Sequence, residues 1–194
     1  MLLVIDNQSA FIKKFKRNYL SDQDFETIFV DHNQPLILPP NINIQGVILS
    51  GGKGNPYEPL NLTTNFIALM NFDVPILGLC LGHEIIAVAN RGRIKKLHNY
   101  NNKKEVVKIY SLEDPIFDGV NEKEVPLIKK HHFYVAQTPE NFVSLAESNS
   151  CPNEIIRHEK KMIYGFQSHP EVSGKQGIRM VINFLKMCGL PAEL

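Results

Sequence analysis

The sequence predicts an α/β fold in which a mainly parallel central sheet is flanked by helices. In the first half of the chain, short apolar runs alternate with stretches of helical spacing, which is typical of strands joined by crossover helices. The runs are almost continuously apolar, as expected for strands buried on both faces. The 194 residues, 43% of them apolar, suffice for the core of one domain. We therefore expect residues 1–194 to form a single domain.

The elements of the first half follow in order. We expect strands over Leu2–Ile5, Phe25–Val30, Gly46–Leu49 and Pro75–Leu79, and helices over Ser9–Leu20 and Leu60–Asn71. Prolines at positions 35, 39 and 40 indicate a loop before the third strand. Parallel sheets place ligand sites at the carboxyl ends of their strands. Asp6, Ser50 and Cys80, which all lie at such ends, are therefore expected along one edge.

The second half of the chain has a different pattern, with several short β-like runs. They cover Glu105–Tyr110, Val125–Ile128, Phe133–Ala136 and Phe142–Glu147. These runs predict a small mixed or antiparallel β extension of the main sheet. A strand over Met162–Phe166 and an amphipathic helix over Gln176–Cys188 complete the expected fold.

The charge balance favours neither nucleic acid nor an acidic membrane as a partner, because 21 Lys and Arg residues accompany 20 Asp and Glu. Three basic clusters, Lys13–Arg17, Arg91–Lys96 and Lys129–Lys130, are interpreted as solvated surface, with a docking face or phosphate contact as the alternative. Three cysteines without a paired framework, and no recognisable secretory leader, predict a cytoplasmic protein. No apolar run approaches the roughly 18 to 20 residues of a membrane helix.

The stretch Gly78–Gly82 is the strongest candidate for a catalytic site. It joins an apolar run ending at Leu77 to a helical pattern over Ile85–Ala89, and it puts Cys80 at the apex of a strand-turn-helix. The glycines leave room for a strained backbone that projects the sulfur. The amides at the start of the helix would favour the thiolate, and the Leu81 amide would hold an oxyanion. The pattern predicts that Cys80 is a nucleophile.

A second candidate segment lies far downstream, where an apolar strand leads into His169, Pro170 and Glu171. A histidine at a strand end can act as a general base, and the proline stiffens the turn that follows. Glu171 is placed to accept the other imidazole N–H, which would fix the tautomer of the ring. We therefore predict that Cys80, His169 and Glu171 form a catalytic triad.

Together these segments resemble the triad-type (class I) glutamine amidotransferases, which hydrolyse glutamine and pass the ammonia to a partner site. The likeness rests on Gly-Leu-Cys-Leu-Gly-His at 78–83 and Gly-Phe-Gln-Ser-His-Pro-Glu at 165–171, and it runs from Leu2 to the last helix. It implies a flavodoxin-like fold and a γ-glutamyl thioester at Cys80. It also implies that Gly52, the second glycine after the strand 46–49, supplies an oxyanion amide beside that of Leu81.

Three further segments are similar to the glutaminase portion of GMP synthetases, whose separate archaeal subunits have about this length. They are Ser148–Glu154, Arg157–Glu159 and Tyr164–Val172. The resemblance implies glutamine as substrate, and a partner ATP-pyrophosphatase subunit that converts XMP to GMP. The Ser-Gly-Gly-Val-Asp-Ser motif of that partner is absent here. ATP and Mg are therefore expected on the partner, and neither a cofactor nor a metal in this chain.

The sequence departs from the family at several positions. Glu84 stands where the family usually has Gln near the substrate, and a carboxylate one helical turn from Cys80 would raise the pKa of the thiol. His131 matches the family's Ser-His-x-Asp region, but Phe133 replaces the Asp. We therefore treat Glu84 and His131 as candidate substrate-binding residues. Lys53 replaces a common proline, and Ser168 replaces an aromatic residue.

Other functions remain open at this point. The amidotransferase subunits of anthranilate and aminodeoxychorismate synthases share the chemistry, but they usually carry Ser-Pro-Gly-Pro-Gly where this chain has Ser50-Gly51-Gly52-Lys53. A non-catalytic regulatory module could keep the fold after Glu84 and Phe133 had eroded glutamine binding. A γ-glutamyl peptidase would need no acceptor subunit. Labelling of Cys80 by a glutamine analogue would exclude the regulatory module.

Overall fold

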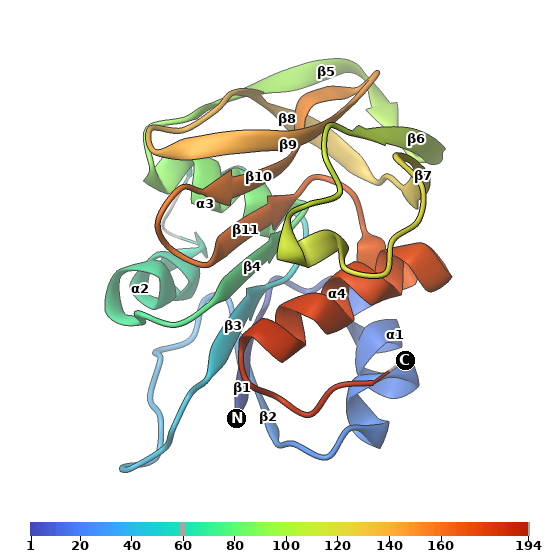
Figure 1. The fold of residues 1–194 in the computed structure, drawn as a ribbon. Coiled ribbons are helices and arrows are strands. Elements are labelled where there is room, and N and C mark those ends of the chain that lie inside the picture. Colours follow the sequence, from blue (N-terminus) through green and yellow to red (C-terminus); the bar gives the residue numbers. More distant parts are fainter. Residues whose placement is uncertain (59–60, 194) are drawn as a thin grey trace.

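A computed structural model describes residues 1–58 and 61–193, and over these residues nine strands form one sheet (Figure 1). Its strand order is β2-β1-β3-β4-β11-β10-β9-β6-β7. The strands are β1 (Leu2–Asp6), β2 (Thr27–Asp31), β3 (Gly46–Leu49), β4 (Ile76–Leu79), β6 (Lys104–Ile109), β7 (Glu124–Ile128), β9 (Phe142–Ser148), β10 (Cys151–His158) and β11 (Ile163–Phe166). A separate two-stranded sheet pairs β5 (Arg93–Asn101) with β8 (His131–Gln137).

The sheet is parallel in one half and antiparallel in the other. The parallel half consists of neighbouring strands β2, β1, β3, β4 and β11. In the other half each strand is antiparallel to its neighbour, in the spatial order β11, β10, β9, β6 and β7. The parallel arrangement brings the carboxyl ends of β1, β3, β4 and β11 to one edge, as the sequence predicts. The expected antiparallel extension is confirmed, and most of it continues the main sheet.

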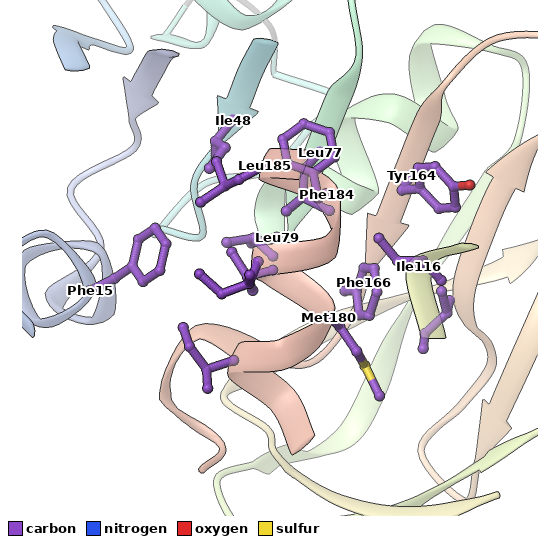
Figure 2. Close-up of a cluster of buried hydrophobic side chains, with 14 of the residues drawn as sticks. Phe15, Ile48, Leu77, Leu79, Ile116, Tyr164, Phe166, Met180, Phe184 and Leu185 are labelled. Atoms are coloured by element: carbon purple, nitrogen blue, oxygen red, sulfur yellow. The ribbon is translucent and has the colours of Figure 1, made fainter. Parts of the chain in front are cut away.

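Four helices cover the two faces of the sheet in the part of the chain described here. They are α1 (Ala10–Asn18), α2 (Thr63–Asn71), α3 (Leu81–Ala89) and α4 (Lys175–Met187), and the short 3-10 turns are η1 (Leu20–Asp22), η3 (Pro115–Phe117) and η4 (Pro170–Val172). On one face, α1 and α4 pack on the sheet, where Phe184 and Leu185 lie near Ile48 and Leu77 (Figure 2). On the other face, α2 and α3 cover a second apolar cluster.

The elements that carry the site agree closely with the expected ones. The predicted strand Gly46–Leu49 is confirmed at both ends, and the first helix begins after Ser9, whose hydroxyl accepts the Phe11 amide at 3.2 Å. The expected start of the second helix, Leu60, lies outside the described residues, and α2 begins at Thr63. Among the described helices, none has the length and apolar character needed to span a bilayer.

Candidate active site

Cys80 occupies a strained turn between β4 and α3. Its backbone adopts φ 49° and ψ −100°, in a region that residues with a side chain rarely enter. The turn requires both flanking glycines to lack a side chain, because a Cβ on Gly78 would lie 2.5 Å from the carbonyl carbon of Gly82. The Cys80 amide donates to the Phe166 carbonyl at 2.7 Å, which ties the turn to β11. The elbow predicted from the sequence is therefore present.

His169 and Glu171 form a buried pair beyond the end of β11. The Nδ1 atom of His169 lies 2.8 Å from Oε1 of Glu171, and the two side chains are only 3% and 1% exposed. An Nδ1–H that donates to the carboxylate leaves the lone pair of a neutral imidazole on Nε2. The ring of Phe11 packs edge-on against the imidazole, with ring centres 4.6 Å apart. The imidazole is thus held in one tautomer and one orientation.

The side chains of Cys80 and His169 approach each other next to Gly51. A Cβ built on Gly51 would lie 2.7 Å from Cε1 of His169 and 3.4 Å from Cβ of Cys80. These two atoms are therefore at most about 6 Å apart, since the sum of the two distances is an upper limit. The missing side chain of Gly51 is what lets the thiol and the imidazole approach each other.

Cys80 and His169 open into one cavity of about 600 Å³. Its walls come from the loop after β1, the loop after β3, the elbow, and β5 and β8 of the small sheet. Gly52, Leu81, Glu84 and His131 also line it. The structure therefore brings every sequence-predicted site residue to this cavity except Glu171, which contacts His169 from behind. Their individual roles stay predictions.

The resting form of Cys80 is a thiol. Burial is the largest influence on its pKa and raises it well above the ordinary value, and the charges of Glu84 and Glu171 raise it further. A hydrogen bond from the Leu81 amide lowers it, as the sequence predicts, but does not outweigh burial. The expectation that the helix start favours the thiolate is thus confirmed in direction, and burial outweighs its effect on the pKa of the thiol. The thiol donates to the Lys130 carbonyl across 3.6 Å.

Glu84 lies in the wall of the cavity, 3% exposed, and accepts a hydrogen bond from Nε2 of Gln167 at 2.9 Å. Burial raises the pKa of its carboxyl to about 7, and the hydrogen bond from Gln167 partly opposes that shift. The carboxyl therefore changes its charge near neutral pH, within one helical turn of Cys80. The expected effect of Glu84 on the pKa of Cys80 is confirmed as the second-largest cause, after burial.

His131 is held on both sides of its ring. Nδ1 lies 2.6 Å from the Phe133 carbonyl oxygen, and Nε2 lies 3.4 Å from the Ser150 hydroxyl. Burial lowers the pKa of this histidine to about 4, so the ring is neutral near pH 7. The ring still reaches the cavity. Its part in substrate binding stays a prediction.

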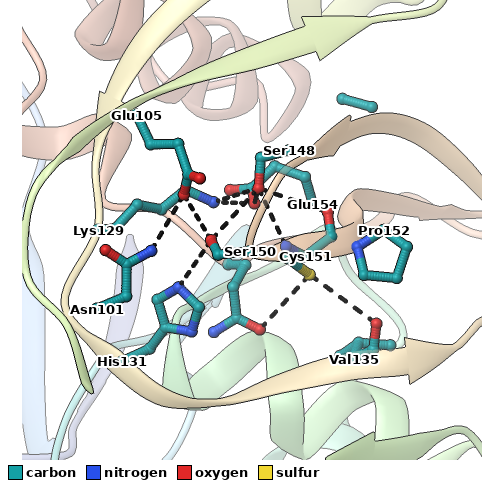
Figure 3. Close-up of polar contacts among 12 residues, drawn as sticks. Asn101, Glu105, Lys129, His131, Val135, Ser148, Ser150, Cys151, Pro152 and Glu154 are labelled. Atoms are coloured by element: carbon teal, nitrogen blue, oxygen red, sulfur yellow. Dashed lines mark hydrogen bonds and ion pairs between the residues drawn. The ribbon is translucent and has the colours of Figure 1, made fainter. Parts of the chain in front are cut away.

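One member of the third basic cluster, Lys129, is not solvated surface, whereas its neighbour Lys130 is exposed as expected. The side chain of Lys129 has no exposed surface, and its ammonium forms an ion pair with the equally buried Glu154 (Figure 3). The expectation for Lys129 is wrong because the chain crosses between two sheets at this point and turns the side chain inward. By contrast, Lys13 and Lys95, from the other two clusters, are exposed as expected.

Sequence reasoning missed three contacts at the site. Phe11 packs on the imidazole, Gln167 holds Glu84, and Lys130 offers its carbonyl to the thiol. Gln167 could have been found, since it directly follows β11 and lies two residues before His169. The carbonyl of Lys130 carries no sequence signal. Among the described residues, no group of three or more His, Cys, Asp or Glu side chains is arranged to hold a metal ion.

Comparison with known proteins places this chain in a family. The family described as "Glutamine amidotransferase class-I" matches residues 3–188. A glutamine-hydrolyzing GMP synthase subunit from Methanococcus aeolicus is 35% identical over 198 aligned positions, which cover 100% of both chains. The protein of the same name from Pyrococcus abyssi is 33% identical, covering 97% of this chain and 99% of the relative.

Solved structures agree. A crystal structure from Thermoplasma acidophilum, described as that of a candidate GMP synthase subunit, superposes with a TM-score of 0.82 at 26% identity over 97% of this chain and 93% of the other. A glutamine amidotransferase from Thermotoga maritima shares the fold, with a TM-score of 0.72 at 19% identity over 95% of this chain and 81% of the other. The expected fold class is confirmed. The chain therefore belongs to the class-I glutamine amidotransferase family.

Proposed function

We propose that this chain is the glutamine-hydrolysing subunit of a two-subunit GMP synthetase, with residues 1–194 as its single glutaminase domain. The observation that carries the hydrolytic part is the meeting of Cys80 and His169 across Gly51, with Glu171 behind the imidazole. The assignment to GMP synthesis rests on the relatives named as GMP synthase subunits, which this chain matches over their full lengths.

The first half of the reaction converts glutamine to a thioester. His169 takes the proton of the Cys80 thiol on Nε2, and the sulfur attacks the carbon of the side-chain amide. The oxyanion that forms is held by the backbone amides of Gly52 and Leu81. When the tetrahedral intermediate collapses, His169 returns the proton to the nitrogen, ammonia leaves, and a γ-glutamyl thioester remains on Cys80.

The second half releases glutamate. His169 removes a proton from water, which attacks the thioester carbon, and the sulfur leaves and is reprotonated by the imidazole. Glu171 keeps the same nitrogen of His169 facing the reaction in both halves. Because the thiol is protonated at rest, the proton transfer to His169 is a required first step.

The released ammonia would be consumed by a separate ATP-pyrophosphatase subunit that converts XMP to GMP. ATP and Mg belong to that subunit in this proposal, and this chain needs neither a cofactor nor a metal. Glu84 and His131, in the cavity wall, are the candidate contacts for the bound glutamine. All three cysteines are buried and unpaired, which supports a reducing cytoplasm. The proposal includes no nucleic acid and no membrane partner.

The test is to assay the purified chain with and without an XMP-binding ATP-pyrophosphatase subunit. We expect glutamate release that the partner stimulates, and GMP formation only in the mixture. Glutamate release without GMP formation would support glutamine hydrolysis and refute XMP as the ammonia acceptor. That result would favour a chorismate-using synthase subunit or a peptidase. Absence of glutamate in both assays would refute the enzyme altogether.

The same preparation can be labelled with a diazoketone analogue of glutamine. Modification at Cys80 is expected, and Cys80→Ala should lose glutaminase activity by at least about a thousandfold. Cys188→Ala is the matched control, because Cys188 is a buried thiol outside the cavity. A chain that binds its partner but is never labelled would be the regulatory module.

A further inference from the structure

The buried ammonium of Lys129 has no part in the proposed chemistry. It pairs with the carboxylate of Glu154 and donates to the Ser148 hydroxyl at 3.1 Å, and that hydroxyl lies 2.9 Å from Glu154 Oε2 (Figure 3). Removing two charges from water is expensive, and apolar replacements of such pairs are often as stable or more stable. The stability of the fold alone is therefore a weak reason for this pair to exist.

The backbone on one side of Lys129 is bonded to the loop that carries His169. The Ile128 carbonyl accepts the His169 amide at 2.8 Å. The Ile128 amide donates to the Ser173 hydroxyl at 2.8 Å, and this hydroxyl donates to the His169 carbonyl at 2.6 Å. The backbone of Ile128 therefore holds the amide of His169 directly, and it holds the carbonyl of His169 through the Ser173 hydroxyl.

The backbone on the other side reaches the nucleophile. The Lys130 carbonyl is the acceptor for the Cys80 thiol. Between β7, which ends at Ile128, and β8, which begins at His131, the chain leaves the large sheet and enters the small one. Lys129 and Lys130 lie in neither strand, and the Lys129 amide donates only to the Lys103 carbonyl, at 2.8 Å. The backbone amide of Lys129 is thus held by Lys103, and its side chain is held by Glu154 and Ser148.

We infer that Lys129 is a positioning residue, whose ion pair with Glu154 fixes the backbone of residues 128–130 and through it the relative placement of His169 and Cys80. The inference rests on the roles of Cys80 and His169 under the proposed function. The ion pair joins this crossing to β10, the strand beside β11, which leads to His169. A small error in that placement would slow the reaction strongly, because catalysis depends on alignment within about 1 Å.

Electrostatics act in the same direction. Burial is the main influence on the pKa of Cys80 and raises it, whereas the Lys129 ammonium is among the influences that lower it. Loss of the ammonium would therefore hinder thiolate formation as well as loosen the backbone.

The decisive experiment compares Lys129→Met with the double variant Lys129→Met/Glu154→Leu. The single variant leaves a buried carboxylate unpaired, and its melting midpoint should fall by about 10 °C. The double variant removes both charges, and its midpoint should return to within about 4 °C of the wild type. Its kcat for glutamine should nevertheless stay about tenfold or more below the wild type, with KM changed by less than about threefold. A residue that served stability alone would recover kcat together with the midpoint.

A second readout does not depend on glutaminase activity. Hydrogen exchange at the His169 amide should be at least about fivefold faster in the double variant, relative to amides of β1. This readout decides the inference even if the wild type proves to have no glutaminase activity. Lys161→Met is the matched control, because Lys161 pairs with Asp73 at 3.2 Å on the surface, with 59% of its side chain exposed. It should change neither kcat nor the exchange rate.

Recovery of wild-type kcat and exchange in the double variant would overturn the inference, as would a change confined to KM. If the double variant does not fold, Ser148→Ala replaces it, since that change removes the hydroxyl shared by the two charged groups. We then expect at least about twofold faster exchange at His169, relative to amides of β1, with the midpoint lowered by only a few degrees, because the Cys151 amide and the Lys129 ammonium each lose an acceptor. Unaltered exchange would again overturn the inference.

Discussion

Gln167 donates from its Nε2 atom to Oε1 of Glu84 across 2.9 Å, in the wall of the cavity that holds Cys80. The bond joins the strand that leads to the imidazole to the first turn of the helix that follows the thiol. Burial gives Glu84 a pKa of about 7, so its charge, and with it the repulsion of a thiolate at Cys80, depends on pH in the neutral range.

Glu84→Gln is expected to give glutaminase activity equal to or above that of the wild type. Below about pH 6 the carboxyl is protonated and the two proteins should be alike. Above about pH 8 the wild-type carboxylate opposes the thiolate, so kcat/KM of the variant should be about three- to tenfold higher. Glutamate release measured from pH 5.5 to 9 tests this. A collapse of activity at every pH would show that the carboxylate takes a direct part in catalysis.

The same substitution should change the stability of the protein with pH. Glu84 ionises near its ordinary pKa of 4.5 when unfolded and near 7 when folded, so between these values the folded state binds more protons and stability falls as pH rises. Relative to the wild type, the free energy of unfolding of Glu84→Gln should be unchanged at pH 4 and about 3 kcal/mol higher at pH 8. Urea unfolding at both pH values measures the difference. A gain independent of pH would contradict the burial account.

Glu171→Gln should lower kcat by about a hundredfold or more without unfolding the protein. The amide could no longer hold the imidazole of His169 in the required tautomer, although it fits the same space. KM should change little, because Glu171 does not line the cavity. Steady-state glutamate release and a thermal melt are the measurements. A loss below about threefold would remove Glu171 from the triad.

Gly51→Ala should reduce kcat by about a hundredfold, because its Cβ would lie 2.7 Å from the imidazole and push it from Cys80. Gly54→Ala is the comparison, since its Cβ would meet only the ends of flexible side chains, at 3.2 Å from Leu81 Cδ2 and 3.6 Å from Leu62. Gly54→Ala should lower kcat much less than Gly51→Ala does. Equal losses in the two variants would mean that the space at Gly51 is not specific to the catalytic pair.

The parallel half of the sheet could be predicted because its strands are apolar on both faces and end at glycines or polar residues. The strand Gly46–Leu49 and the elbow at Cys80 are predictable for this reason, and the structure confirms both. The sequence does not predict strand β5, because along Arg93–Asn101 few side chains are buried and nothing in its basic sequence marks a buried face. The sequence does not predict strand β10 either, because this strand buries Asn153 and Glu154 beside a proline.

The candidate triad could be predicted because its chemistry leaves local marks, a glycine-flanked cysteine and a His-Pro-Glu turn. The contacts of Gln167 and Lys129 could not, since they depend on which strands become neighbours in space. A lysine next to another lysine predicts solvent exposure from the sequence alone. Only the pairing of the sheet shows that Glu154 meets the Lys129 ammonium in the interior.

The thiol of Cys80, bonded to the Lys130 carbonyl and kept protonated by its surroundings, has a consequence for chemical resistance. Peroxides and electrophiles react with the anionic form of cysteine and only slowly with the neutral form. Between turnovers the nucleophile should therefore react with peroxide more slowly than an exposed thiol of ordinary pKa. It becomes vulnerable only during the interval in which the imidazole carries its proton.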